Sequence, residues 1–157
     1  MWTDKIDHVP YLHVTCPDIP PQRRREIAEQ LTTALNDLFF DPRSRLTREE
    51  LRERTTVHFV SYGDDELFIG ARTPEERNAI DLTVELSDWS MSVRQQRRIA
   101  QHLTPLLARL FEVPPAGLDG INIRYHRYPA TDFAVGGRLL SDIIPLIGRV
   151  MKRIASR

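Results

Sequence analysis

Two stretches of the chain read almost the same: REIAEQLT at Arg25–Thr32 and RRIAQHLT at Arg97–Thr104. The likeness continues beyond them at the same offset, with leucine and phenylalanine recurring in the same order at Leu35, Leu38 and Phe39 and at Leu107, Leu110 and Phe111. In both stretches the apolar residues return every three or four positions, which places them on one face of a helix. The sequence therefore predicts the same amphipathic helix twice, as an internal repeat.

A strand-like segment comes before each predicted helix, and another comes after it. The preceding segments, Tyr11–Cys16 and Ile80–Leu86, alternate between aliphatic and polar residues, as a strand does when one of its faces is buried. The following segments are Thr56–Tyr62 and Gly120–His126, and each leads into a short apolar stretch that contains glycine. The pattern predicts a β-α-β unit in each half of the chain, followed by a small hairpin.

The order of elements also predicts how the strands pair. Strands joined through a helix are parallel, because their connection is a right-handed crossover. Two such units predict an α+β fold, with duplicated β-α-β units forming a four-stranded mixed sheet and two helices on one face. The sequence offers no further long helix before residue 138 for the other face, so we expect self-association to cover it.

The predicted domain boundaries follow the repeat. Residues 1–9 form an N-terminal extension, and residues 10–140 form one domain made of two repeats, 10–72 and 79–140. Residues 141–157 form a C-terminal helical extension, whose apolar positions recur at near-helical spacing. This extension is short and contains Pro145, which favours a packing helix over a membrane anchor.

Composition excludes several classes of protein. The 157 residues include 22 Lys and Arg and 22 Asp and Glu, so the formal net charge is zero and gives no electrostatic footprint for nucleic acid or anionic lipid. The sequence shows no membrane-spanning apolar run and no secretory signal. The single cysteine, Cys16, cannot form an internal disulfide. We therefore expect a cytoplasmic protein with no nucleic-acid or membrane partner.

This arrangement resembles the tautomerase superfamily, which includes 4-oxalocrotonate tautomerase and macrophage migration inhibitory factor. The resemblance covers roughly residues 10 to 140. Pro10, followed by alternating residues, is similar to the proline that opens the first strand in the family. The stretch DFAVGG at Asp132–Gly137 is similar to the aromatic and double-glycine hairpin of the short tautomerases, and INIRY at Ile121–Tyr125 is similar to the family's second strand.

The resemblance implies a fused, two-unit member that forms a homotrimer and needs no cofactor. In the family, a free N-terminal proline acts as a general base that moves a proton between carbon and oxygen of an enol. The implied reaction is keto-enol tautomerisation of small 2-oxo or 2-hydroxy-unsaturated carboxylates, of the phenylpyruvate or 2-hydroxymuconate type. The implied catalytic position is Pro10, and the implied substrate-binding residues are Asn122, Arg124 and Phe133.

Pro10 departs from the family pattern, because nine residues precede it. A nitrogen inside a peptide bond has no usable lone pair, so Pro10 can act as a base only if the chain is cleaved after Val9. His13 and His58, on two strands of the first unit, are alternative proton-transfer groups. Each is alternatively a hydrogen-bonded histidine at a subunit interface. Two hypotheses therefore stay open: a tautomerase, and a non-catalytic binding or assembly module on the same scaffold.

The other candidate residues also have two interpretations. Asn122 and Arg124 point to the same face of a strand, where they either grip a carboxylate or pair with acidic residues of a neighbouring subunit. Phe133 is either hairpin packing or a pocket wall. No HxxxH or CxxC spacing occurs, so no metal is predicted, and no GxSxG, P-loop or GxGxxG motif occurs either.

Overall fold

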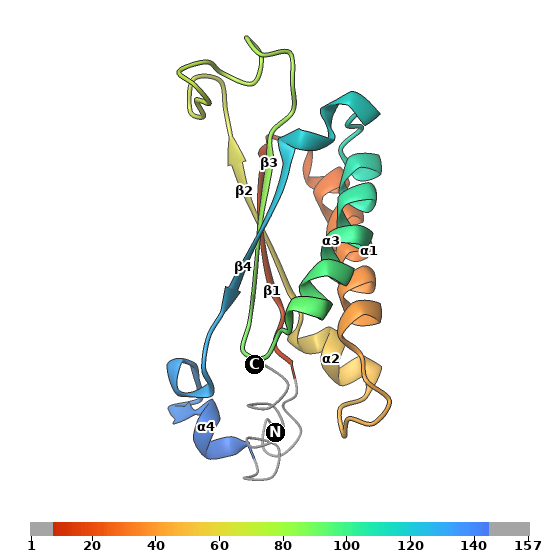
Figure 1. Cartoon of the computed structure of the whole chain (residues 1–157), viewed down its shortest axis with the longest axis vertical. Helices are drawn as coiled ribbons and strands as arrows, with labels where there is room; N and C mark the ends of the chain where they lie inside the picture. The colour runs from red at the N-terminus through yellow and green to blue at the C-terminus, as the bar shows by residue number, and fades with distance from the viewer. Residues whose placement is uncertain (1–7, 145–157) are drawn as a thin grey trace.

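A four-stranded sheet with two long helices on one face forms the body of the molecule (Figure 1). The computed structural model describes residues 8–144. The strands of the sheet are β1 (Tyr11–Pro17), β2 (Thr56–Tyr62), β3 (Leu82–Asp88) and β4 (Ile121–Arg127). The helices are α1 (Pro21–Phe39), α2 (Arg48–Arg54), α3 (Val93–Leu110) and the short α4 (Leu140–Ile143). The predicted α+β fold is confirmed.

The sheet has the order β2-β1-β3-β4. The pairs β1–β2 and β3–β4 are parallel, which confirms one β-α-β unit in each half of the chain. The central pair, β1–β3, is antiparallel and joins the two units, with Tyr11 opposite Ser87 and Val14 opposite Val84. This pairing brings the end of β3 next to the start of β1.

The core lies between the sheet and the two long helices. The alternation predicted for β1 and β3 is confirmed, because every second residue of each strand is buried. The fully buried residues of these strands and helices include Leu12, Val14, Leu82, Leu86, Ile27, Leu31, Leu35, Ile99, Leu103 and Leu107. Cys16 belongs to this core, and its burial raises the pKa of its thiol to about 11, so the side chain behaves as a neutral apolar group.

The helix ends follow from local chemistry. Ser92 caps α3 by accepting a hydrogen bond from the backbone N–H of Gln95. Thr47 and Glu50 form a complete capping box at the start of α2, as their spacing predicts. α3 continues through Pro105 without a break.

The two units end in similar turns of different length. In the second unit, β5 (Ala134–Val135) and β6 (Arg138–Leu139) form a two-stranded hairpin around Gly136 and Gly137, which have φ angles of +58° and +80°. Glycine suits these left-handed conformations because it has no Cβ. In the first unit, the predicted hairpin is reduced to a single bridge between Ile69 and Arg72.

Two parts of the predicted organisation lie outside the described residues. These are residues 1–7 of the N-terminal extension and residues 145–157 of the C-terminal extension, so the domain boundaries stay a prediction. The described beginning of the C-terminal extension is α4. Between residues 8 and 144, no helix is both long enough and apolar enough to cross a membrane.

Candidate active site

The start of β1 is the position at which the family resemblance implies a free amine. Here Pro10 is buried and its nitrogen is bonded to Val9, while its carbonyl accepts a hydrogen bond from the N–H of Thr56 at 2.9 Å. The antiparallel β1–β3 pairing brings Asp88 to this point. The N–H of Val9 donates to Oδ1 of Asp88 at 2.9 Å, so the segment before Pro10 is tied to the second unit.

His8 is held in a defined orientation beside this point. Its Nδ1 lies 2.6 Å from Oδ2 of Asp88, whose side chain is fully buried. The imidazole ring also packs edge-on against Phe39, with 5.1 Å between ring centroids and an interplanar angle of 68°. Both carboxylate oxygens of Asp88 are therefore used to fix the chain segment that carries His8.

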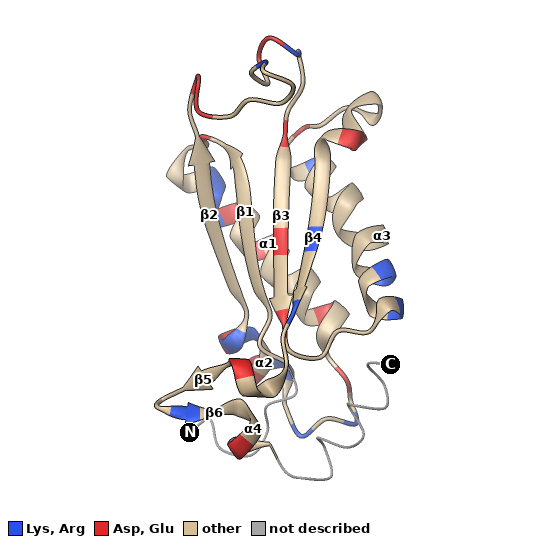
Figure 2. Cartoon of the chain, turned by 60° about the vertical axis from the view of Figure 1, so that its left-hand side comes forward, with Lys and Arg blue, Asp and Glu red and all other residues tan. Residues whose placement is uncertain are grey.

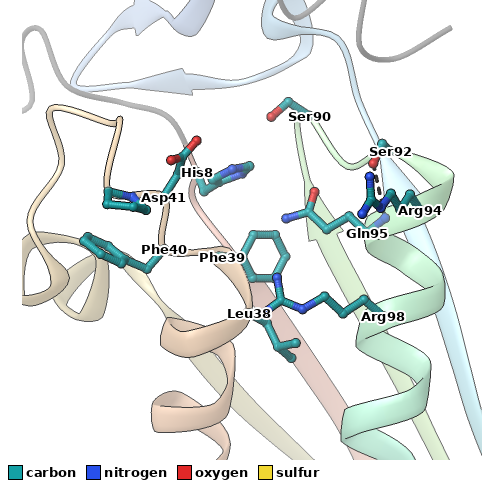
Figure 3. Close-up of a pocket in the computed structure, with 11 residues that line it drawn as sticks. His8, Leu38, Phe39, Phe40, Asp41, Ser90, Ser92, Arg94, Gln95 and Arg98 are labelled. Carbon is teal, nitrogen blue, oxygen red and sulfur yellow. Dashed lines mark hydrogen bonds between the residues drawn. The ribbon is translucent and has the colours of Figure 1, made fainter.

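A cavity of about 650 Å³ opens beside His8 (Figure 3). Its walls come from the end of α1 with the residues that follow it, and from the β3–α3 connection with the first turns of α3. The lining residues are His8, Leu38, Phe39, Phe40, Asp41, Pro42, Ser90, Ser92, Arg94, Gln95 and Arg98. This volume is typical of sites that bind small molecules.

The α3 wall of the cavity is positively polarised. Arg94 and Arg98 line it, and the first turn of α3 contains no acidic residue that would offset the partial positive charge of the helix N-terminus. Gln95 adds an amide to the same wall (Figure 3). On the α1 side the cavity is lined by the exposed carboxylate of Asp41, which accepts a hydrogen bond from the N–H of Arg43. An anionic group is therefore expected to lie against α3, away from Asp41.

Ser90 gives independent evidence for a polar ligand. Its Oγ is buried, and it has no hydrogen-bond partner within the described part of the chain. Ser90 lines the cavity from the β3–α3 connection (Figure 3). A buried hydroxyl without a partner costs free energy, so a ligand oxygen in the cavity would satisfy it.

Phe133 packs near the chain segment that carries His8, and it does so outside the cavity. It packs in a small cluster around the buried residues Leu140, Ile143 and Ile144, together with Val9 and Trp89. Its ring stacks on that of Tyr128 at 5.8 Å. Phe133 is absent from the residues that line the cavity, so its position corresponds to hairpin packing that holds the segment next to His8.

His13 and His58 lie on the sheet face opposite the helices, because they alternate along β1 and β2 with the residues that pack on the core. They are register partners on β1 and β2, and their ring centroids are 5.2 Å apart. Nδ1 of His13 lies 3.1 Å from Glu85, which also contacts Nε2 of His126 at 3.1 Å. Nδ1 of His58 lies 2.9 Å from the hydroxyl of Tyr11. The structure thus brings both histidines together, but in a network on the open sheet face.

Asn122 and Arg124 lie on the same open face, on the edge strand β4. Asn122 is opposite Thr83 and Arg124 is opposite Glu85. Both side chains are exposed, and neither lines the cavity beside His8. The sequence predicts a pocket that Asn122 and Arg124 share with Pro10, whereas the titratable residues that line this cavity include His8, Arg94 and Arg98. Asp88 contacts His8 but does not line the cavity.

The Glu85 network makes a testable prediction about stability. Hydrogen bonds from His13, and then from His126, lower the pKa of Glu85 below its ordinary value of 4.5. Because the pKa is lower in the folded state, the ionised carboxylate of Glu85 adds to the free energy of unfolding above pH 4.5. This contribution is lost as the pH falls through the folded-state pKa. We therefore expect the wild type to lose its advantage over Glu85→Gln below pH 4.5 in urea titrations.

The effect of Glu85→Gln should stay below about 1 kcal/mol, because the carboxylate is partly exposed and is screened by water. Glu53→Gln, which removes an exposed carboxylate from α2, is the matched control. An advantage of the wild type that persists unchanged at pH 3 would contradict the assignment.

In the described residues, no group of three or more His, Cys, Asp or Glu side chains is arranged to hold a metal ion.

Comparison with known proteins places this arrangement in a known fold. No family model and no curated protein matches the sequence. A wild-type fused 4-OT, described as an asymmetric trimer, superposes with a TM-score of 0.67 at 17% identity, covering 84% of this chain and 97% of the other. A member of the cis-3-chloroacrylic acid dehalogenase family gives 0.62 at 18% identity, covering 92% and 99%. The macrophage migration inhibitory factor of Toxoplasma gondii gives 0.61 at 14% identity, covering 82% and 98%.

Proposed function

From the tautomerase-superfamily fold of this chain, we propose that it is a cofactor-independent keto-enol tautomerase or isomerase of small 2-oxo or 2-hydroxy-unsaturated carboxylates. The observation that carries the proposal is the cavity of about 650 Å³ beside His8, with Arg94 and Arg98 in its wall. His8 lies two residues before Pro10, the position at which the resemblance implies a proton-transferring group, and Pro10 itself does not line the cavity.

The polarity of the cavity suits such substrates. A carboxylate binds against the α3 wall, where a guanidinium offers two parallel hydrogen bonds. The rest of a small molecule then points toward His8 and Ser90, between Phe39 and Gln95. Hydrogen-bond donors near the developing enolate oxygen lower the barrier, because they stabilise charge that appears only in the transition state.

The direct test is the ketonisation of enol-phenylpyruvate by the purified full chain, followed by ultraviolet absorbance. We expect a rate that is proportional to protein concentration and that saturates with substrate. A rate equal to that in buffer would refute the tautomerase. Calorimetric binding of malonate by such an inactive chain would instead support the binding module, the second hypothesis from the sequence.

We also propose that the chain forms a homotrimer through the open sheet face. The fused 4-OT structure with the same fold is described as a trimer, and here nothing between residues 8 and 144 covers the sheet face opposite the helices (Figure 2). We expect light scattering to give a mass of about three times the 18.2 kDa of one chain. Val60→Arg, on the open face of β2, should lower that mass, because it places an unpaired charge in the interface.

Leu118→Arg is the control for self-association, because Leu118 is exposed to a similar degree but lies in the turn before β4. A monomeric wild type, or equal masses for the two arginine variants, would contradict assembly through the open face.

A further inference from the structure

We propose that His8 is the catalytic residue that moves the proton in this cavity, and that Asp88 is the positioning residue that fixes its ring. This inference rests on the proposed tautomerase function. In this proposal the imidazole of His8 takes the role that the resemblance gives to a free proline amine. Pro10 has no free amine here, and His8 lies two residues before it. The site is thereby assigned to a residue pair in which His8 comes from the segment before the first unit and Asp88 comes from the second unit.

The hydrogen bond to Asp88 determines which nitrogen can act. An ionised carboxylate only accepts hydrogen bonds, so the proton of the neutral ring is on Nδ1, which lies 2.6 Å from Asp88. Nε2 then carries a lone pair. Across residues 8–144, Nε2 has no hydrogen-bond partner, and the ring lines the cavity. A buried carboxylate that orients an imidazole in this way also stabilises the imidazolium formed during proton transfer.

The surroundings of His8 hold it in place. The side chain is only 13% exposed, the ring packs on Phe39, and the N–H of the next residue, Val9, is bonded to the same carboxylate. Val9 is in turn packed in the cluster that contains Phe133. These contacts restrict the ring to one orientation, which lowers the entropic cost of placing a base against a substrate.

The proposed step balances without a co-reactant. Nε2 of His8 takes the proton from the hydroxyl of a 2-hydroxy-2-ene carboxylate, and the O–H electron pair forms the C=O bond. The electrons of the C=C bond then take the proton back from the imidazolium at carbon 3. The product is the 2-oxo acid, and His8 returns to its neutral form. Arg94 and Arg98 hold the carboxylate throughout.

The other histidines are less suited to this role. Nδ1 of His13 lies beside Glu85 and Nδ1 of His58 beside Tyr11, both on the open sheet face. Neither lines the cavity. His102, on α3, contacts the backbone carbonyl of Arg98 and also lies outside the cavity lining.

The test compares His8→Ala with the matched histidine variant His102→Ala in the full chain. We expect His8→Ala to lower kcat for enol-phenylpyruvate by about 100-fold or more, the usual contribution of a general base. Its Kd for malonate, a carboxylate that is not turned over, should change by less than about threefold, since the arginines remain. His102→Ala should keep the wild-type kcat. Far-UV circular dichroism checks that both variants fold.

Asp88→Asn tests the positioning role through a signal that a purely structural residue would not change. In the wild type, the ¹⁵N spectrum of the His8 ring should show the tautomer protonated on Nδ1. In D88N this tautomer should lose its preference, and kcat should fall while KM changes little. If D88N does not fold, the ¹⁵N spectrum of the wild type alone still decides, because the opposite tautomer would overturn the assignment.

The outcomes separate this inference from the function on which it rests. A wild type with no activity refutes the proposed tautomerase and the role of His8 together. An active wild type with an equally active His8→Ala overturns only the inference. A loss of activity in His13→Ala or His58→Ala, with His8→Ala unaffected, would likewise overturn it. The proton-transfer group would then be a histidine on the open sheet face.

Discussion

Replacing Leu86 by alanine is expected to lower the free energy of unfolding by about 2–5 kcal/mol. Leu86 lies on the central strand β3, opposite Leu12 of β1, and both are fully buried beneath the two helices. The truncation removes apolar contacts and leaves a cavity at the junction of the two units. Because neighbouring side chains in a close-packed core relax only in part, most of that cost is retained.

Leu118→Ala is the matched control, since the same atoms are removed from a side chain that is 40% exposed. It should change the free energy of unfolding by less than about 1 kcal/mol. Both variants are compared by urea unfolding at one protein concentration, because assembly would make the midpoint depend on concentration. Equal midpoints for the two variants would contradict the description of the core.

Arg98→Ala is expected to weaken binding of small carboxylates by about tenfold to 100-fold. A hydrogen bond to a charged group contributes about 1.5–3 kcal/mol, and each 1.4 kcal/mol corresponds to a factor of ten. Arg98 lines the cavity from α3, and the helix N-terminus adds to its attraction for an anion. The effect can be measured as the Kd for malonate or as KM for enol-phenylpyruvate.

Arg97→Ala provides the control, because Arg97 is the neighbouring exposed arginine of α3 and does not line the cavity. It removes the same net charge, so a general loss of electrostatic attraction would affect both variants equally. Equal weakening by the two substitutions would contradict a specific carboxylate contact at Arg98.

The fold could be predicted because its signals are local and repeated. The alternation of β1 and β3 and the apolar faces of α1 and α3 depend on nearest neighbours along the chain, and the duplication gives each signal twice. The sequence also contained the capping box of α2 and the double glycine of the second hairpin. The register of β1 against β3 could not be predicted from the sequence, because it depends on contacts between residues some 70 positions apart.

The candidate site depends on that register. Asp88 follows the apolar residues of β3, and nothing nearby in the sequence marks it as a partner for His8, 80 residues away. The position of Arg98 in the helical repeat predicts a solvent-exposed side chain. Only the structure shows that this side chain also lines the cavity beside the end of α1. The roles predicted for Pro10, His13, His58, Asn122, Arg124 and Phe133 stay predictions, although none of these six residues lines the cavity beside His8.

The antiparallel junction also bears on stoichiometry. At one end of the β1–β3 pair, the register places Pro10 opposite Asp88. When the register is continued to the other end, it places Ile80 opposite Asp18, so that Ile80 corresponds to Pro10 and Asp18 corresponds to Asp88. The counterpart of His8 there is Asn78, which has no basic nitrogen, and Asp18 is exposed and ion-paired with Arg24 at 3.4 Å. The two halves therefore have the same backbone arrangement, but only one of them carries the His8–Asp88 pair. We expect the protein to be saturated by one equivalent of ligand per polypeptide rather than by two.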